Sequence, residues 1–483
     1  MDVHKFLDRT DSPEAQQLLK LFGSFHCTVI NLLLFELERN QDRVAILEKY
    51  NTILLKTKVL KYPLLVVCLI RLGFNPIIKH GSMFGGDTPL HRATAMNSGL
   101  SVRALLVVVK DIDTRGTYNF TPLNNASRTS EYNTRLLLDM GAHPDQKGGE
   151  LDSTPIMFAA QAGEVGIVKR LLIAGASIGG ANGVGKTVAH YSVECGNAKV
   201  CKFIDKHQSP TDAFNIEGNN VLHNAIHYQN LESIRYLLTR GVDCNVHAKD
   251  LRKTHPLHMA IDREINIEIL KTLVKWGADI NAVNDELQTP LHLATRIGRH
   301  DIMKYLVEQG ANVNLKNKND NTPLQIAISE LDLTSIKILA ENGADVNVVN
   351  NYSENILHRI CVESMTGDRL PILGYVLTLP IDLNARDGHG DTPLHNYINT
   401  SAGEDGFQHL LKTGVNINIY NNAGRLPLNY AIKKGREYAP QLLNKDLIYD
   451  DDDINDYIMR LFRKKYTQKR LLEVLCANGM NLE

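Results

Sequence analysis

Residues 180–187 have the sequence Gly-Ala-Asn-Gly-Val-Gly-Lys-Thr, which matches the GxxxxGK(S/T) pattern of a phosphate-binding loop. In such a loop, backbone N–H groups surround the phosphates of a nucleotide, and the lysine, here Lys186, contacts the terminal ones. That chemistry requires a buried strand before the loop and a helix after it. The preceding residues, Val168–Gly175, instead have a helical pattern, and no strand ending in a magnesium-binding aspartate is recognisable. We therefore interpret residues 180–187 as a glycine-rich turn and keep a nucleotide-binding enzyme as the alternative.

Histidine is the second residue type that could do chemistry, because imidazole binds metals and transfers protons near neutral pH. The chain has 18 histidines, and seven of them recur about 33 residues apart: His91, His190, His223, His258, His292, His358 and His395. Zinc needs nitrogen ligands within about 2 Å, so rings on separate repeats cannot share one ion. The other candidates, His207, His227, His247 and His255, have no typical ligand spacing. We expect structural histidines and no metal.

The seven cysteines also predict no site. They contain no CxxC pair that could start a zinc site, and their odd number is a poor disulfide framework. Cys195 follows His190 by five residues, but small buried residues are expected in this stretch, and buried thiols are usually inert. No GxSxG motif occurs. We therefore expect no catalytic residue, no cofactor and no enzymatic activity.

The regular spacing of the histidines comes from an internal repeat. The tripeptide Thr-Pro-Leu, or a degenerate form of it, returns with its second residue at positions 89, 122, 155, 188, 221, 256, 290, 323, 356, 393 and 427. The steps are 33, 33, 33, 33, 35, 34, 33, 33, 37 and 34 residues. Self-similarity at such a period indicates a stack of supersecondary units, each unable to bury its apolar face alone.

Each repeat has the residues that start and stop two helices. Threonine is a good N-cap, and proline suits the first helical position because its missing N–H would be unpaired there. In the repeat that begins at Thr289, the first helix is expected over Leu291–Gly298 and the second over Ile302–Glu308. Gly310 then allows the left-handed backbone that ends a helix. Polar residues lead to the next threonine, which predicts a turn or hairpin.

These residues resemble the ankyrin repeat, whose signature is TPLHxAAxxG…LLxxGAxxN over about 33 residues. The resemblance covers roughly Met83 to Leu443, and it is strongest at Thr254–Asn347 and weakest at Lys186–Pro210. It implies a mostly α fold, namely an ankyrin-repeat solenoid of stacked helix pairs with β-hairpin loops, in about eleven repeats.

Three regions follow from the pattern. Residues 1–82 form a helical capping region with a decayed repeat, and residues 83–445 form the repeat array. Residues 446–483 contain an acidic and basic interruption and a terminal half-repeat. The aspartates before the basic part favour a helix N-terminus near Asp453.

Composition limits the partners. The chain has 53 basic and 54 acidic side chains among 483 residues, and 43% of its residues are hydrophobic. A formal charge of −1 argues against a globally basic nucleic-acid binder. No apolar run approaches the roughly 18 residues that span a bilayer, and the N-terminus lacks the pattern of a secretory signal. We expect a cytoplasmic protein, with the nucleus as a second compartment, that is monomeric alone and binds other proteins.

The family binds partners through its hairpin tips and first helices, which places the expected contacts at defined positions of this chain. These are Lys249, Arg252, Lys253, Asp285, Glu286, Lys316, Lys318, Asp320, Asn350 and Tyr352. Ankyrin repeats are also targets of asparagine hydroxylation at the Gly-Ala-x-x-Asn turn. Asn281, Asn314 and Asn347 occupy that position, and unmodified structural asparagines are the alternative.

The resulting expectation is a non-enzymatic scaffold or adaptor that mediates protein–protein interaction. One specific alternative is a substrate adaptor of a ubiquitin ligase, because many ankyrin proteins have a terminal module for that role, although residues 446–483 match no such motif. A viral or bacterial protein that interacts with host proteins has the same layout.

Overall fold

The computed structural model describes residues 53, 57–71, 73–79, 86–207, 212–249, 252–261, 265–361, 369–400, 403–433 and 439–442. Within these ranges the regular elements are helices, and β-structure is limited to two isolated bridges, Gly148 with Ser153 and Ala181 with Thr187. The chain divides into two compact units, the first made of residues 1–243 and 248–250 and the second of residues 244–247 and 251–483. The expected mostly α fold is confirmed, and the division falls inside the array expected over residues 83–445.

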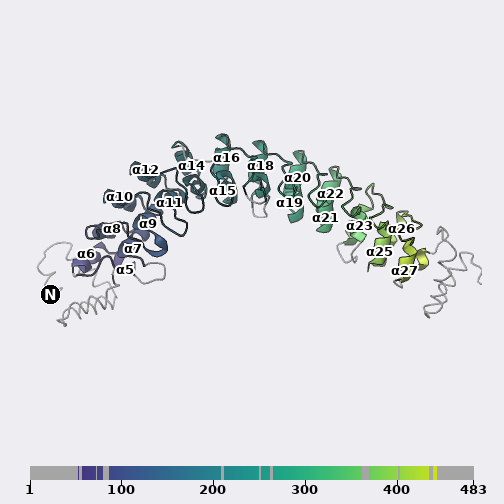
Figure 1. Ribbon diagram of the computed structural model, residues 1–483, viewed down its shortest axis with the longest axis horizontal. Coiled ribbons are helices and arrows are strands. Elements are labelled where there is room, and N and C mark those ends of the chain that lie inside the picture. The colour runs from purple at the N-terminus through teal and green to yellow at the C-terminus, as the bar shows by residue number, and fades with distance from the viewer. Residues whose placement is uncertain are drawn as a thin grey trace, which may run out of the picture. The chain divides into compact units, whose positions relative to one another are not determined.

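The first unit is a stack of helix pairs (Figure 1). Two short helices, α5 (Thr57–Leu60) and α6 (Pro63–Arg71), pack against the first full pair. The five pairs that follow are α7 (Pro89–Ala95) with α8 (Gly99–Leu106), α9 (Pro122–Ser127) with α10 (Glu131–Asp139), α11 (Pro155–Gln161) with α12 (Val165–Ile173), α13 (Val188–Ser192) with α14 (Ala198–Asp205), and α15 (Val221–His227) with α16 (Leu231–Thr239). One 3-10 turn, η2 (Thr117–Asn119), precedes α9.

The second unit repeats the same arrangement. Its pairs are α17 (Pro256–Met259) with α18 (Ile267–Lys275), α19 (Pro290–Ile297) with α20 (His300–Glu308), α21 (Pro323–Ser329) with α22 (Leu333–Glu341), α23 (Ile356–Cys361) with α24 (Arg369–Val376), α25 (Pro393–Asn399) with α26 (Glu404–Lys412), and α27 (Pro427–Lys433) with α28 (Ala439–Leu442). None of the described helices is long and apolar enough to span a membrane. Residues 446–483, expected to hold an interruption and a half-repeat, lie outside the described residues.

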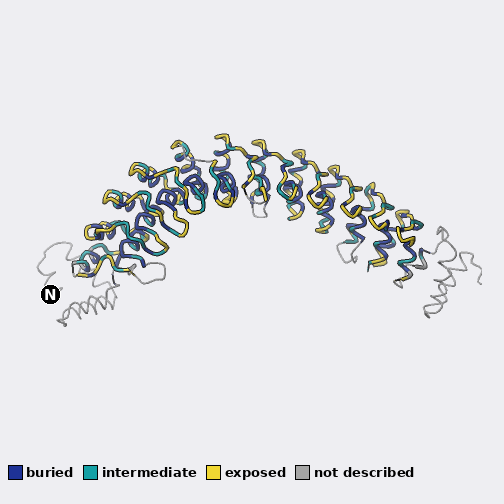
Figure 2. The backbone as a smooth tube through the Cα atoms, viewed as in Figure 1, coloured by how far each residue is buried: buried dark blue, intermediate teal, exposed yellow. Residues whose placement is uncertain are grey.

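Small residues let neighbouring first helices approach closely. The fifth residue, counted from the start of the first helix, is a fully buried alanine in most repeats, and in the short α17 it is the C-cap residue, Ala260: Ala93, Ala126, Ala159, Ala225, Ala260, Ala294, Ala327 and Ala431. At this position α25 has Tyr397, and Gly406 of α26 leaves the space for its ring, because a Cβ there would collide with the tyrosine hydroxyl. Figure 2 shows buried residues along the helices of each unit and exposed residues on the turns.

Threonine caps the first helices as the sequence predicts. Thr289 has an extended backbone, its hydroxyl accepts a hydrogen bond from the N–H of His292 at 3.4 Å, and Pro290 follows as the first helical residue. In return, the backbone N–H of Thr289 donates to Nδ1 of His292 at 3.1 Å. Because this reciprocal capping pairs two N–H groups that the helix itself cannot pair, it stabilises the start of each first helix.

The same histidine ring joins its repeat to the next one. Nε2 of His292 lies 3.1 Å from the carbonyl oxygen of Asn321 in the following turn. A carbonyl only accepts, so Nε2 has the proton and Nδ1 is the free acceptor that the cap requires. Rings in five other repeats make the same contact with a carbonyl of the next turn: His91, His190, His258, His358 and His395.

Amide side chains replace histidine in three repeats, with Asn429 accepting the N–H of Leu426 in the last, and two of the three make both contacts. Oε1 of Gln325 accepts the N–H of Thr322 at 2.9 Å, and its Nε2 donates to the carbonyl of Val348 at 3.4 Å. Asn124 does the same with Thr121 and Gln146, at 2.8 and 3.1 Å. An amide has one acceptor and one donor side, like a neutral imidazole, so either group can make both contacts. In α11 this position holds Met157, whose sulfur accepts the N–H of Thr154 at 3.5 Å and which has no donor for the next turn.

The expected β-hairpins are wrong for the described loops, which are turns without strand pairs. In the turn after Asn317, the side chain Oδ1 accepts two N–H groups, from Asn319 at 2.9 Å and Asn321 at 3.1 Å. One backbone bond, from the N–H of Asn317 to the carbonyl of Asn321 at 3.0 Å, closes the turn. Because the side chain takes N–H groups that a strand ladder would use, the loop ends after one pair.

The neutral histidines predict a loss of stability in mild acid. Burial lowers the pKa of His190, His258 and His292 to about 4, whereas an unfolded histidine has a pKa of about 6.5. The unfolded chain therefore binds protons between these values and the folded chain does not, so the free energy of unfolding falls as pH falls from 6.5 towards 4. Each unit of pKa difference corresponds to about 1.4 kcal/mol. Urea denaturation at pH 7.5, 6 and 5 should show this decrease.

A matched variant distinguishes the contribution of the histidines to the pH dependence of stability from that of the carboxylates, which also titrate in acid. His292→Gln should fold, because Gln325 makes both contacts one repeat later, and it should show a weaker dependence on pH than the wild type between pH 7.5 and 5. An unchanged pH dependence in this variant would contradict the capping role of the neutral ring.

Candidate partner-binding surface

The tips of the turns are held by asparagine or aspartate side chains. Each accepts the N–H groups two and four residues further on, as Asn284 does from Glu286 and Gln288, both at 2.9 Å. The equivalent residues of other repeats are Asn182, Asn215, Asn317, Asn350, Asp387 and Asn421. This position was missed in the sequence, although an asparagine that recurs about 33 residues apart would have shown it.

Backbone hydrogen bonds connect most tips to the one before. In the second unit, the N–H of Asp285 donates to the carbonyl of Arg252 at 2.9 Å, and the N–H of Lys318 donates to the carbonyl of Glu286 at 3.0 Å. In the first unit, Gly183 donates to Leu151 at 2.8 Å in the same way. Tips that are joined in this way form a hydrogen-bonded edge that presents its side chains at regular intervals.

Seven of the ten expected contact residues lie on consecutive tips of the second unit. Arg252 and Lys253 are exposed on the tip before α17, and Glu286 is exposed on the next one. Lys318 forms an ion pair with Asp285 on the preceding tip, with 3.4 Å between its Nζ and a carboxylate oxygen. These residues, with Lys316 and Asp320, give a mixed charge pattern along the edge.

Three expected contact residues differ from that group. Asn350 is only 8% exposed, and its side chain holds the turn by accepting from Tyr352 and Glu354, so it offers little to a partner. Tyr352 is 73% exposed at the tip. Lys249 belongs to the first unit, where its Nζ lies 4.0 Å from the ring centroid of Phe214.

The three asparagines expected as hydroxylation positions have a structural contact in common. Oδ1 of Asn314 accepts the N–H of Asp345 in the next repeat at 2.8 Å, and its Nδ2 donates to the carbonyl of Gly343 at 3.1 Å. Asn281 and Asn347 also accept an N–H from the following repeat, at 2.8 and 2.7 Å. These side chains therefore tie neighbouring loops together whether or not they are modified.

Most N–H groups of the phosphate-loop-like residues are already donated within the protein. Gly183 donates to the carbonyl of Leu151, Gly185 donates to the carbonyl of Asn182, and the N–H groups of Val184 and Lys186 both donate to Oδ1 of Asn182. The loop follows α12 rather than a strand. Its residues form an inter-repeat turn.

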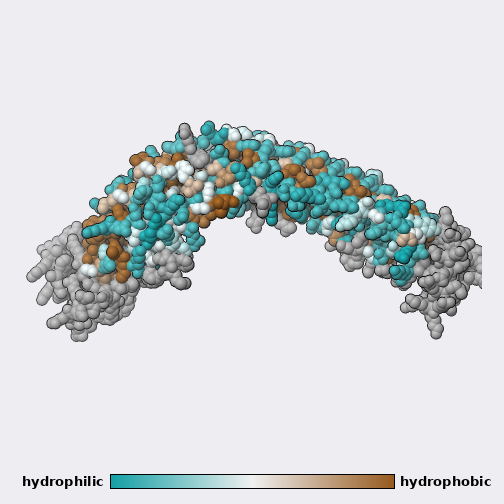
Figure 3. Space-filling view, viewed as in Figure 1, coloured by the Kyte–Doolittle hydropathy of each residue, from teal (hydrophilic) through white to brown (hydrophobic). Residues whose placement is uncertain are grey.

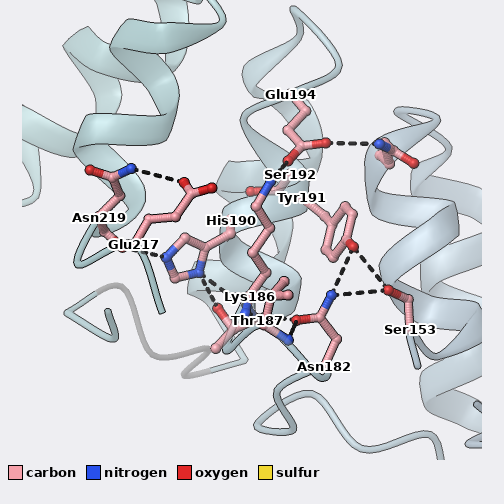
Figure 4. A network of polar contacts seen from close by, with 12 residues as sticks. Ser153, Asn182, Lys186, Thr187, His190, Tyr191, Ser192, Glu194, Glu217 and Asn219 are labelled. Carbon is pink, nitrogen blue, oxygen red and sulfur yellow. Dashed lines mark hydrogen bonds and ion pairs between the residues drawn. The ribbon is translucent and has the colours of Figure 1, made fainter. Parts of the chain in front are cut away.

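Lys186 belongs to a polar network inside the repeat stack (Figure 4). Its Nζ lies 3.0 Å from a carboxylate oxygen of Glu194, whose other oxygen accepts from Gln161 at 2.8 Å. The Glu194 side chain is 3% exposed. Burial opposes the charge on Lys186, but the hydrogen bond and the charge of Glu194 outweigh it and raise the lysine pKa. The amine is therefore paired internally, in place of the phosphate contact that the motif suggests.

The described histidines and cysteines form no catalytic or metal centre. No group of three or more His, Cys, Asp or Glu side chains in the described part of the chain is arranged to hold a metal ion. Burial raises the pKa of the Cys195 thiol, and raises that of Cys201 to about 11. Both shifts favour the protonated thiol, which is a poor nucleophile.

Comparison with known proteins identifies the family. A family model described as "Ankyrin repeats (3 copies)" matches residues 134–213, 156–250, 204–284 and 257–350. Residues 134–350 therefore consist of ankyrin repeats, and they include parts of both units. Repeats of this family typically mediate protein–protein interaction.

Individual relatives match only parts of the chain. The chain is 30% identical over 153 residues to the nuclear factor NF-kappa-B p105 subunit of Gallus gallus, covering 31% of this chain and 15% of that protein. It is 27% identical over 184 residues to the putative palmitoyltransferase ZDHHC13 of Danio rerio (38% and 22%). It is 26% identical over 172 residues to the putative ankyrin repeat protein FPV232 of Fowlpox virus (35% and 35%). The matched segments thus span about a third or less of each relative.

A solved structure is also similar. The ankyrin repeat domain of Bcl-3, a member of the IkappaB protein family, is 26% identical, and the match covers 53% of this chain and 99% of that domain with a TM-score of 0.39.

Removing the Lys186 amine should reduce stability. Lys186→Ala leaves the Glu194 carboxylate buried without its cationic partner, and an underpaired buried polar group costs about 1–3 kcal/mol. Urea denaturation should therefore show a lower free energy of unfolding. Adding Glu194→Gln should recover part of the loss, because a neutral amide costs less to bury than a carboxylate.

The same variants test the nucleotide alternative. ATP and GTP should raise the melting temperature of neither the wild type nor the variants, because a bound ligand stabilises the state that binds it. An ATP-dependent rise in the wild type that Lys186→Ala abolishes would revive the enzyme interpretation.

Proposed function

We propose that the chain is a non-enzymatic scaffold or adaptor that binds one or more proteins through the tips of its second unit. The observation that supports this is the hydrogen-bonded edge, on which Arg252, Asp285, Lys316 and Lys318 are held on a fixed backbone. A surface that is already ordered binds without the entropic cost of ordering loops. The mixed charges suit a partner surface of mixed charge.

Two narrower roles belong to the same proposal. The first is a substrate adaptor of a ubiquitin ligase, with residues 446–483 as the recruiting segment; these residues lie outside the described part of the chain. The second is a viral or bacterial protein that binds host proteins, a role that the partial similarity to the Fowlpox virus protein supports. Either role would use the tips for one partner and a second surface for another.

Compartment and assembly are also proposals. We place the protein in the cytoplasm or nucleus and propose that it is monomeric alone. Four cysteines of the described residues are free thiols: Cys195, Cys201, Cys244 and Cys361. Free thiols are typical of proteins in a reducing compartment.

Hydroxylation of Asn281, Asn314 and Asn347 remains a proposal as well. Their side chains are only partly buried or exposed, within reach of a modifying enzyme once the loop opens. Mass spectrometry of peptides after incubation with an asparagine hydroxylase tests it. An added oxygen on these residues supports the proposal, and its absence on all three removes it.

Reversing the tip charges should weaken partner binding and leave the fold intact. In the variant, Arg252, Lys253, Lys316 and Lys318 are each replaced by glutamate. Exposed substitutions usually change stability by less than about 0.5 kcal/mol each, so the circular dichroism spectrum should match that of the wild type. Quantitative affinity purification should show at least one protein that the wild type retains and the variant loses.

A matched control reverses four exposed lysines on the second helices of the same unit: Lys275, Lys304, Lys337 and Lys412. This variant has the same change in net charge, and it should retain the proteins that the wild type binds. If both variants lose the same proteins, the effect comes from net charge, and the tips are not the binding surface. If binding survives both but fails after deletion of residues 446–483, that segment binds the partner.

A further inference from the structure

The tips of the first unit differ from those of the second in chemistry. The residue four positions before the first helix is apolar in three consecutive repeats, namely Tyr118, Leu151 and Val184, and Ile216 lies one residue off this position in the next. Tyr118 is 48% exposed, Leu151 43% and Ile216 73%. In the second unit the same position holds Arg252, Glu286, Asn319, Tyr352, His389 and Ala423. Tyr352, at 73% exposed, is the one large aromatic side chain among these six. On the face shown in Figure 3, hydrophobic surface is more extensive over the first unit.

These apolar side chains lie on a continuous edge. Gly149 donates its N–H to the carbonyl of Tyr118 at 3.0 Å, Gly183 donates to Leu151 at 2.8 Å, and Ile216 donates to Val184 at 3.0 Å. The four tips are thus connected in series, and their apolar side chains repeat once per repeat. We call Tyr118, Leu151, Val184 and Ile216 the apolar edge.

The charge available beside the apolar edge is mostly acidic. Glu150 and Asp152 flank Leu151, and Glu217 follows Ile216; all three are exposed. The basic side chains on these tips are largely engaged. Arg115 donates to the carbonyls of Asn119 and Lys147, and Lys186 pairs with Glu194, which leaves Lys147 as the exposed base on the four tip segments.

The spacing of the tips selects the shape of an occupant. Neighbouring packed helices lie about 8–10 Å apart, so the apolar side chains recur at about that interval. Seven residues of an α-helix advance about 10.5 Å, which matches one anchor per repeat. In an extended strand, side chains on one face are about 6.6 Å apart, and every second one is about 13 Å apart. Neither distance matches the interval between tips.

We propose that the apolar edge of the first unit binds an amphipathic helix of a partner protein, with apolar side chains seven residues apart flanked by lysine or arginine. The partner's apolar side chains contact Tyr118, Leu151, Val184 and Ile216, and its basic side chains pair with Glu150, Asp152 and Glu217. A helix of about 20 residues, about 30 Å long, spans the four tips. This inference rests on the proposed protein-binding function and assigns a partner class to a second edge.

The test uses the full chain and a designed fluorescent peptide. The peptide is an amphipathic helix with leucine at every seventh position, lysines beside each leucine and alanine elsewhere. Fluorescence anisotropy should show saturable binding. The variant Leu151→Asp with Ile216→Asp should bind at least about tenfold more weakly, because each substitution removes an apolar contact and adds a charge at the contact point. Glu150→Lys with Glu217→Lys should weaken binding through charge repulsion.

Two controls make the result specific. Val107→Asp with Ile173→Asp changes side chains that are 80% and 76% exposed at the ends of second helices of the same unit, and it should bind like the wild type. A peptide with leucine at every sixth position should bind at least about tenfold more weakly. Circular dichroism of each variant should match the wild type.

Several results would overturn the inference: no saturable binding of the heptad peptide, equal loss in the Val107/Ile173 control, or indifference to leucine spacing. Binding to vesicles of anionic lipid that Leu151→Asp with Ile216→Asp abolishes would assign the edge to a membrane surface instead. Self-association in analytical ultracentrifugation that the same variant abolishes would assign it to a second copy. The peptide could fail to bind the apolar edge while the charge-reversed variant of the second unit still loses a bound protein. That combination would overturn this inference and support the proposed scaffold function.

Discussion

The fold depends on a side chain that is uncharged and can accept a hydrogen bond on one side while donating one on the other. In most repeats this is the neutral ring of a histidine, as in His292, and in some it is an amide, as in Gln325. The α11 repeat has Met157 instead, which makes only the accepting contact. Its accepting side completes the start of its own helix, and its donating side holds the next repeat. Helix initiation and stacking therefore depend on the same group, and a single repeat has neither a complete cap nor a buried face.

The structural use of this group accounts for residues that resemble chemical motifs. A neutral histidine that is bonded on both nitrogens, such as His292, has no free nitrogen for a metal or a substrate proton. Lys186, in a phosphate-loop-like sequence, is paired with Glu194, and the loop's N–H groups are already donated to Asn182 and Leu151. What remains accessible is the edge of connected tips. In the second unit this edge is mostly polar and charged, and in the first it is apolar with acidic neighbours; the two proposed partner classes rest on this difference.

Sequence reasoning predicted the features that recur in every repeat. The period gave the helix pairs, Thr-Pro gave their first residues, and glycine gave the ends of the second helices, because each depends on local backbone preference. The hairpins were wrong, since the side chain of a residue such as Asn317 takes N–H groups that a ladder would use. The same position explains Asn350, which looked like an exposed tip residue and instead holds its turn from a buried place. The contact of Glu194 with both Lys186 and Gln161 joins different repeats, so no local pattern could show it.

The central claim is that the tips form an ordered surface before any partner arrives. Native-state hydrogen exchange measures this directly at the amides that donate to the preceding tip, namely those of Gly183, Ile216, Asp285, Lys318 and Gly388. Although these amides lie in surface turns, the account predicts that they exchange at least about tenfold more slowly than the same amides in an unstructured peptide, because exchange requires the inter-repeat bond to open. Exchange at the unstructured rate in these turns would show that the tips move independently, and it would contradict the account.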